Sequence, residues 1–301
     1  MVSRYHIASD ERKGAPMPPC AIVDTHLHLW DPKHFRISWL DGNNTLEHTF
    51  LAKEFAHHSA GIAVEACVYL EVAVEAPYSY LEATYINALA QHMPQLQGIV
   101  AAAPVEYGTQ ARAYYAALRA IGSRVKGVRR LFQGEADPNY AMLPNVIAGV
   151  QALAEYDLSF DICIFHPQLP AVVELVKQCP QVQFILDHIG KPDIKGGQRE
   201  PWMRDMRALA AFPNVVCKFS GMTTEADHRH WTIDDLRPYS EHVFDVFGEN
   251  RVLFGGDWPV SLQSTSYRAW IETVDTLTSS LSPVAQRKFW SENAKRVYRL
   301  G

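Results

Sequence analysis

The sequence contains few cysteines and no long apolar run, and these two absences exclude several classes of protein. Its five cysteines are odd in number and form no CxxC pair, which argues against a disulfide framework and favours a reducing, cytoplasmic setting. No stretch approaches the roughly 18 consecutive apolar residues of a membrane-spanning helix. Residues 1–19 lack the apolar core of a signal peptide, so we expect a short N-terminal arm ahead of the fold.

A strong excess of one charge is also absent. The chain has 28 Lys and Arg against 33 Asp and Glu, a net charge of -5, so neither nucleic acid nor an acidic membrane surface is an expected partner. No Gly-rich fingerprint follows the first apolar run, which weakens a dinucleotide-binding fold. The 301 residues are 48% hydrophobic and show no shift in composition, which predicts one large core over residues 20–301.

Eight short apolar runs recur along the chain with helical segments between them. Their continuous rather than alternating apolarity is typical of parallel strands that are covered on both faces. Segments 114–121 and 169–176 carry apolar residues at helical spacing, and 289–298 resembles a closing helix. This order predicts an α/β fold, a single-domain (β/α)8 TIM barrel, with an open doubly wound sheet as the rival. The predicted strands are 21–23, 64–70, 98–103, 125–128, 160–164, 182–186, 215–218 and 252–254.

Polar or ionisable residues follow nearly every one of these runs. In a (β/α)8 barrel the active site lies at the carboxyl ends of the strands. So many polar groups at one end are costly unless they meet a ligand or one another, which indicates an enzyme. In chain order they are Asp24, His26, His28, Glu71, Arg129, Arg130, His166, Asp187, His188, Lys218, Ser220 and Asp257.

His26 and His28 are expected on one face of the first strand, because successive side chains of a strand alternate. Together with His188 and Asp257 they could hold one divalent metal, commonly zinc, with water in an open position. The same residues could also act without metal: the histidines would polarise a carbonyl while Asp257 deprotonates a water. Both routes lead to hydrolysis at an acyl centre, and the residues alone leave them open.

Two of these four residues have a structural alternative. Asp257 could cap the helix that follows it, although the two preceding glycines favour an exposed carboxylate at the strand tip. His188 could be a core histidine that is hydrogen-bonded to Asp187.

The basic residues have alternatives too. Arg129 and Arg130 point to opposite faces, so we expect one to enter the site and the other to pair outside it. Lys218 is as easily an ion-paired or solvated barrel residue as a ligand-binding one. His166 has the weakest case, because a proline follows it at once.

Four motifs in one order resemble the amidohydrolase superfamily, and in particular its sugar-lactonase branch. They are VDTHLHLWDP at residues 23–32, LDHIGKP at 186–192, CKFSGM at 217–222 with TEAD at 224–227, and FGGDWPV at 254–260. This branch contains L-fuconolactonase-like and L-rhamnonolactonase-like enzymes and the 2-pyrone-4,6-dicarboxylate hydrolases. The resemblance covers nearly the whole chain, from about residue 20 to 300.

The resemblance implies hydrolysis of a small sugar-derived 1,4- or 1,5-lactone to its hydroxy acid. It implies that His26, His28 and His188 face the lactone carbonyl or a metal, and that Asp257 activates water. Glu71 stands where related lactonases often place a glutamine, an exchange that would alter substrate choice. The substrate-binding candidates are Arg129, Arg130, Glu71, Trp39, Trp202 and Lys218.

The chain departs from the two-metal members of the superfamily at the fourth predicted strand. It has Arg129 and Arg130 where a bridging lysine or glutamate would stand, so we expect one divalent metal or none. The alternatives are a metal-dependent decarboxylase of the same superfamily, a pyrone-dicarboxylate hydrolase, and a non-catalytic sugar-acid binding protein. The sequence leaves a homo-oligomer open.

Overall fold

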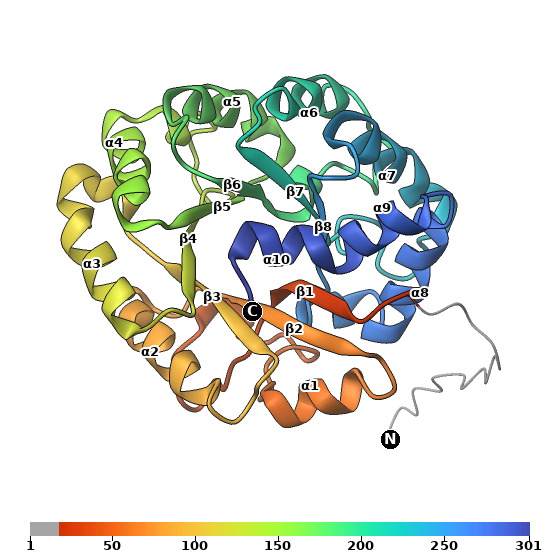
Figure 1. The fold of residues 1–301 in the computed structure, drawn as a ribbon, viewed down its shortest axis with the longest axis horizontal. Coiled ribbons are helices and arrows are strands. Elements are labelled where there is room, and N and C mark those ends of the chain that lie inside the picture. The colour runs from red at the N-terminus through yellow and green to blue at the C-terminus, as the bar shows by residue number, and fades with distance from the viewer. Residues whose placement is uncertain (1–17) are drawn as a thin grey trace.

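The computed structural model describes residues 18–301, so most of the arm expected over residues 1–19 lies outside the described part of the chain. Eight strands form the centre of the molecule, and their order around the sheet is their order along the chain (Figure 1). Every neighbouring pair is parallel, as the continuous apolar runs predict. The strands are β1 Ile22–Leu27, β2 Val64–Leu70, β3 Leu96–Ala102, β4 Val125–Leu131, β5 Ser159–Cys163, β6 Phe184–Leu186, β7 Val215–Phe219 and β8 Val252–Phe254.

The sheet closes where the carboxyl end of β1 meets the residues after β8. Leu27 and Trp258 form a parallel bridge, and the His28 N–H donates to the Trp258 carbonyl at 2.8 Å. The Asp257 N–H donates to the His26 carbonyl at 2.7 Å. The predicted (β/α)8 barrel is therefore confirmed, and its closure joins the two segments that carry His26, His28 and Asp257.

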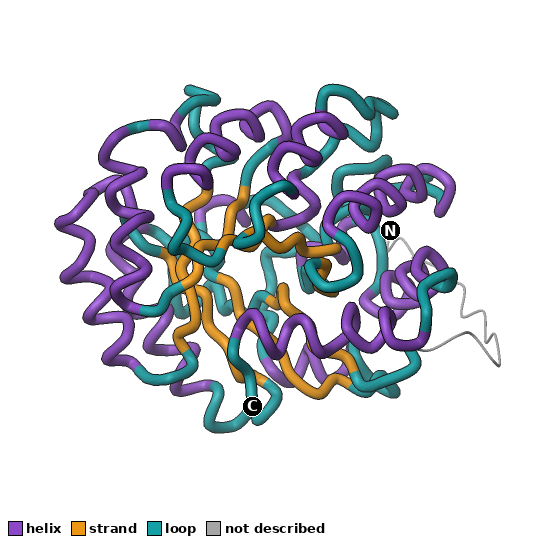
Figure 2. Tube along the Cα trace, turned by 45° about the horizontal axis from the view of Figure 1, so that its top comes forward, coloured by secondary structure: helices purple, strands orange, loops and turns teal. Residues whose placement is uncertain are grey.

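Helices surround the strands on the outside (Figure 2). The predicted helical segments 114–121 and 169–176 fall within α3 and α5, and 289–298 is a π-helix over Lys288–Glu292 that continues into α10. Within residues 18–301, none of the helices has the length and apolarity to cross a bilayer. The helices are α1 Ala52–His58, α2 Ser79–Leu89, α3 Arg112–Ile121, α4 Pro144–Ala152, α5 Leu169–Gln178, α6 Trp202–Ala210, α7 Ile233–Phe247, α8 Tyr267–Thr278, α9 Pro283–Arg287 and α10 Asn293–Tyr298.

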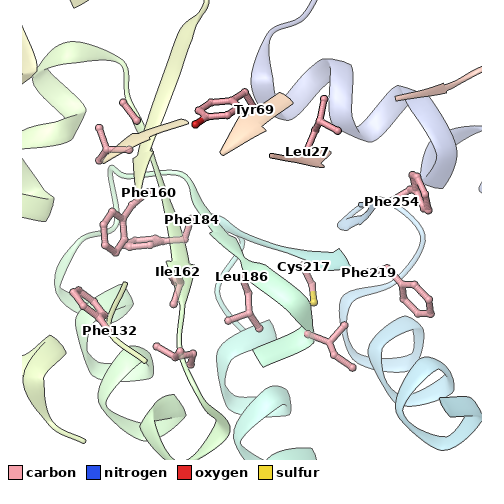
Figure 3. Close-up of a cluster of buried hydrophobic side chains, with 14 of the residues drawn as sticks. Leu27, Tyr69, Phe132, Phe160, Ile162, Phe184, Leu186, Cys217, Phe219 and Phe254 are labelled. Carbon is pink, nitrogen blue, oxygen red and sulfur yellow. The ribbon is translucent and has the colours of Figure 1, made fainter. Parts of the chain in front are cut away.

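Two apolar layers result from the alternation of side chains along the strands. Val68 and Leu70 pack inside the barrel. Tyr69, between them in sequence, belongs to the larger layer between strands and helices, part of which Figure 3 shows. Tyr298 of α10 belongs to the inner layer, and α10 crosses the ring of strands in Figure 1. Arg299, just after α10, bonds backbone carbonyls at the starts of β4 and β5, so α10 covers the amino end of the barrel. The carboxyl end is left for a site.

Candidate active site

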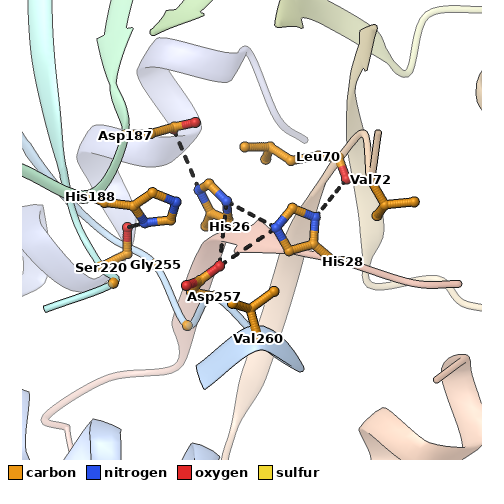
Figure 4. Close-up of polar contacts among 12 residues, drawn as sticks. His26, His28, Leu70, Val72, Asp187, His188, Ser220, Gly255, Asp257 and Val260 are labelled. Carbon is orange, nitrogen blue, oxygen red and sulfur yellow. Dashed lines mark hydrogen bonds and ion pairs between the residues drawn. The ribbon is translucent and has the colours of Figure 1, made fainter. Parts of the chain in front are cut away.

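Three side chains at the carboxyl end converge as the sequence predicts. The Nε2 atoms of His26 and His28 lie 3.2 Å apart, and the Asp257 Oδ1 atom lies 3.7 Å and 3.5 Å from them (Figure 4). None of the three residues is more than 5% exposed. We call His26, His28 and Asp257 the acceptor triad, for the reason given below.

The two glycines before Asp257 allow β8 to approach β1 closely. A Cβ atom at Gly256 would lie 2.4 Å from an Asp24 carboxylate oxygen, and one at Gly255 would lie 2.9 Å from the His26 Cβ. Asp257 itself has a φ of 53°, a left-handed conformation that few residues other than glycine and Asn or Asp adopt. Its side chain lines a cavity and makes no cap for the 3-10 turn that follows, so the cap alternative is not what the structure shows.

Hydrogen bonds orient the histidines of the triad. The His28 Nδ1 atom lies 2.9 Å from the Leu70 carbonyl oxygen, which can only accept, so a neutral His28 carries its proton on Nδ1. Its Nε2 lone pair then points at Asp257 and at His26. Burial and the nearby Lys218 ammonium hold the pKa of His26 well below its usual value, so this ring is neutral. The Arg129 Nη1 atom, which can only donate, lies 3.4 Å from the His26 Nε2 atom, so this nitrogen is the acceptor of the ring.

Acceptor atoms that face one another without a shared proton repel, unless a cation lies between them. A tetrahedral zinc ion with ligands at 2.0–2.1 Å spaces its ligand atoms about 3.3–3.4 Å apart. The three edges of the acceptor triad measure 3.2, 3.5 and 3.7 Å. The donor set therefore fits one divalent cation with three protein ligands and an open position.

His188 is near this triad but does not complete it. Its Nδ1 atom is 2.9 Å from the Ser220 hydroxyl, and its ring centroid is 4.3 Å from that of His26. Burial, reinforced by His26, holds its pKa well below the usual value. The expected four-residue ligand set thus divides into three converging atoms and one neighbouring imidazole that lines the cavity. The partner of His188 is Ser220 and not Asp187.

The triad lies at a cavity of about 400 Å³. Trp39, Val72 and Val260, from the segments after β1, β2 and β8, give it apolar surface. The segments after β4, β6 and β7 contribute polar groups, among them Gln133 and Lys191. Its lining comprises His28, Trp39, Val72, Ala73, Arg129, Leu131, Gln133, Cys163, His188, Lys191, Thr224, Glu225, His228, Asp257, Val260 and Gln263.

The two adjacent arginines point in opposite directions, as predicted. Arg129 borders the cavity and donates to Glu71 at 2.7 Å and to Asp187 at 3.1 Å. Arg130 instead points outside the barrel and donates to Glu135 at 2.5 Å, so its assignment as a substrate-binding residue is not supported. Glu71 is buried beneath Arg129 and does not line the cavity. It orients the arginine and has no contact of its own with the cavity.

Lys218 is an ion-paired residue of the barrel interior and does not reach the cavity. Its ammonium lies 2.6 Å from Asp161 and 3.0 Å from Asp187, and Tyr298 donates to Asp161 at 2.6 Å. The signal for Asp161 was an acidic residue within the apolar run at 160–164, which sequence reasoning passed over. Together these residues form what we call the ion network: Glu71, Arg129, Asp187, Lys218 and Asp161.

The remaining candidates also divide into residues that line the cavity and residues that do not. Trp39 lines the cavity, and its indole N–H is bound by the Val72 carbonyl at 2.7 Å. Trp202 begins α6 rather than lying in a loop, is 1% exposed, and donates to the Ile189 carbonyl at 2.8 Å. It is therefore core, and the expectation that it contacts substrate is not supported. His166 lies outside the cavity lining.

Comparisons with known proteins identify the family of the chain. A family model described as amidohydrolase matches residues 23–300. The chain is 34% identical over 181 residues to an L-fucono-1,5-lactonase of Burkholderia ambifaria, a match that covers 59% of this chain and 62% of that enzyme. A second L-fucono-1,5-lactonase, from Burkholderia multivorans, is 30% identical over 293 residues, which is 92% of this chain and 96% of the relative.

A solved structure has the same fold over nearly the whole length. The crystal structure of an amidohydrolase from Burkholderia multivorans with bound zinc has a TM-score of 0.82 and 28% identity, and covers 94% of this chain and 100% of that one. The resemblance to the sugar-lactonase branch is confirmed by these relatives. Since the family model spans residues 23–300 and the polar strand ends meet at one cavity, the chain is an enzyme of the amidohydrolase family.

Proposed function

We propose that this enzyme hydrolyses a small, neutral sugar lactone, an aldono-1,4- or 1,5-lactone, to the hydroxy acid. The observation that carries the proposal is the convergence of the acceptor triad at a small cavity. A volume of about 400 Å³ is near the lower end for ligand sites, which suits a single ring better than a polymer. The similarity to two L-fucono-1,5-lactonases supports the same substrate class.

The residues of the site supply the groups that lactone hydrolysis needs. Asp257 accepts a proton of the water that attacks the carbonyl carbon and returns it to the ring oxygen as the carbon–oxygen bond breaks, which gives an alcohol and a carboxylic acid that ionises to the carboxylate. When Ser220 donates its hydroxyl proton to Nδ1, His188 carries its own proton on Nε2 and can donate it to the carbonyl oxygen. The guanidinium of Arg129 borders the same cavity and stabilises negative charge there.

We assign His26, His28 and Asp257 as the residues that would hold a divalent ion, with zinc as the proposed metal. When bound, such an ion polarises the carbonyl and lowers the pKa of a water. His188 and Arg129 serve the same purposes of orientation and charge stabilisation with or without it. Elemental analysis of the purified enzyme, together with activity before and after chelation, tests this assignment.

The charges of the cavity argue against a dicarboxylate substrate. Arg129 is already engaged by Glu71 and Asp187, and Lys191 lies 3.8 Å from Glu225. A pyrone dicarboxylate or an aromatic acid would bring carboxylates beside Glu225 and beside a guanidinium whose charge is already matched, so it would have to displace the partners of Arg129. A neutral lactone requires no such exchange.

The test is a panel of L- and D-aldonolactones with pH-indicator detection, beside 2-pyrone-4,6-dicarboxylate and an aromatic carboxylic acid. We expect ring opening of a neutral aldonolactone and no reaction of either acid. Release of carbon dioxide from the aromatic acid would favour the decarboxylase. Binding of a lactone without turnover would favour a sugar-acid binding protein and would overturn the proposal.

A further inference from the structure

Four consecutive residues after β6 have left-handed backbone conformations. His188, Ile189, Gly190 and Lys191 have φ values of 52°, 49°, 71° and 46°. Only glycine adopts such angles without steric cost, so this turn persists because its surroundings hold it. The Lys191 N–H closes the turn on the His188 carbonyl at 2.9 Å.

The turn is held from two sides. The Trp202 indole donates to the Ile189 carbonyl at 2.8 Å, and Gly221 leaves room for the imidazole of His188, because a Cβ there would lie 2.6 Å from its Nδ1 atom. Side chains three residues apart in a 3-10 turn lie on the same side. The turn therefore presents His188 and Lys191 to the cavity together, and both line it.

Lys191 has donor capacity that the protein leaves unused. Its ammonium is 2.6 Å from the Gln133 Oε1 atom, but 3.8 Å from Glu225, which is beyond hydrogen-bond distance. An ammonium has three N–H donors, so a ligand in the cavity can accept at least one of them. Arg129 differs, because its guanidinium is bound by the side chain and carbonyl of Glu71 and by Asp187.

Gln133 and Glu225, the polar neighbours of Lys191, add further hydrogen-bonding groups to the cavity. The Gln133 Oε1 atom accepts from both Lys191 and the Cys163 thiol, the latter at 3.3 Å, which orients the NH2 group of the same amide toward the remaining space. Glu225 adds an acceptor on the same cavity. Two donors and one acceptor side by side match neighbouring hydroxyl groups, each of which donates and accepts.

We propose that Lys191, Gln133 and Glu225 form a subsite that binds the ring hydroxyls of the lactone, with Lys191 as its specificity-determining residue. The strained turn couples this subsite to His188, so that hydroxyl binding places the carbonyl beside the reacting groups. The inference rests on the proposed lactone hydrolysis, but it concerns recognition rather than chemistry.

The test compares a hydroxylated lactone, L-fucono-1,5-lactone, with unsubstituted δ-valerolactone in wild type and Lys191→Met. We expect KM for the hydroxylated lactone to rise about 10- to 100-fold, the usual effect of losing a charged hydrogen bond, with a much smaller change in kcat. The ratio of kcat/KM for the hydroxylated over the unsubstituted lactone falls by the same factor. Lys177→Met, which removes an exposed lysine of α5, is the matched control and keeps the wild-type ratio. Equal losses on both lactones, or no loss on either, would overturn the subsite.

A binding measurement separates this inference from the proposed function. The hydroxylated δ-lactam keeps the ring and the hydroxyls but resists hydrolysis, so calorimetry with it reports recognition alone. If the wild type opens no lactone, the proposed function fails. Weaker lactam binding by Lys191→Met than by wild type supports the subsite in that case too, and equal binding overturns it.

Discussion

Two groups of ionisable residues, one in the barrel interior and one at the carboxyl end, differ in how their charges are matched. The ion network alternates in sign, with contacts of 2.6–3.1 Å from Asp161 through Lys218, Asp187 and Arg129 to Glu71, and none of its members is more than 4% exposed. The acceptor triad is equally buried, but its three atoms face one another, and the contact of Arg129 with the triad is the 3.4 Å approach of its Nη1 atom to the His26 Nε2 atom.

This difference separates residues that support the structure of the site, the ion network, from residues available for chemistry, the acceptor triad. A buried charge that is fully paired fixes the positions of its neighbours, whereas a buried cluster of acceptors is costly unless it serves a ligand. The pKa values follow this division only in part, because burial raises the pKa of Asp161, a member of the ion network, to about 6 in spite of Lys218. Burial alone would raise the pKa of Asp187, but Lys218 and Arg129 outweigh it and the pKa is lowered. Asp24, which has hydrogen bonds but no cation, has its pKa raised to about 6 by burial.

The largest expected effect is that of Asp257→Asn. The amide keeps the shape of the carboxylate but cannot take a proton from water, so we expect kcat to fall about 10²–10⁴-fold. The free energy of unfolding should stay close to that of the wild type, because Asp257 lines the cavity and belongs to no paired network. Steady-state kinetics and urea unfolding measure the two quantities.

Asp227→Asn is the matched control for this variant. It makes the same exchange at an exposed carboxylate of the loop after β7 and should leave kcat as in the wild type. Wild-type turnover by Asp257→Asn would remove Asp257 from the role of base and would weaken the distinction between the two groups.

The second effect is expected in the ion network, and it concerns stability. Lys218→Met leaves Asp161 and Asp187 buried without the cation that lies between them, so we expect the free energy of unfolding to fall by about 3–5 kcal/mol. Chemical denaturation measures it, with Lys177→Met at the surface as control. A variant of unchanged stability that had lost its activity would instead assign Lys218 to the chemistry.

Much of this division could be predicted from the sequence, because it depends on periodicity. Alternation along β1 placed His26 and His28 on one face, and alternation along β4 separated Arg129 from Arg130. The pairing of Lys218 with Asp161 could not be predicted in the same way, since 57 residues separate them and only the closed barrel brings β5 and β7 close. Trp202 was misplaced because the aromatic residue begins a helix whose position depends on the left-handed turn at 188–191.

The smallest expected effect is on the pH dependence of the free energy of unfolding, to which Asp24 and Asp187 should contribute with opposite signs. The Asp24 carboxylate accepts from the Gly256 N–H at 2.8 Å, the His26 N–H at 2.9 Å and the Tyr267 hydroxyl at 2.9 Å, but burial and the nearby Asp257 still raise its pKa to about 6. Its pKa in the unfolded chain is about 3.9. Between these values the folded state binds more protons than the unfolded state, so the contribution of Asp24 to stability falls as pH rises.

Asp24→Asn should remove that decline. Two pH units at about 1.4 kcal/mol each give an upper bound near 3 kcal/mol, so we expect the unfolding free energy of the variant relative to wild type to rise by about 1–3 kcal/mol between pH 4.5 and 6.5. Any constant cost of the substitution, such as a weakened hydrogen bond, cancels between the two pH values. Asp187, whose pKa is lowered, has the opposite sign, because its contribution is present at neutral pH and is lost on acidification. Parallel pH curves for Asp24→Asn and wild type would mean that the pKa of Asp24 is the same in the folded and the unfolded state. Its hydrogen bonds would then offset the effect of burial on that pKa.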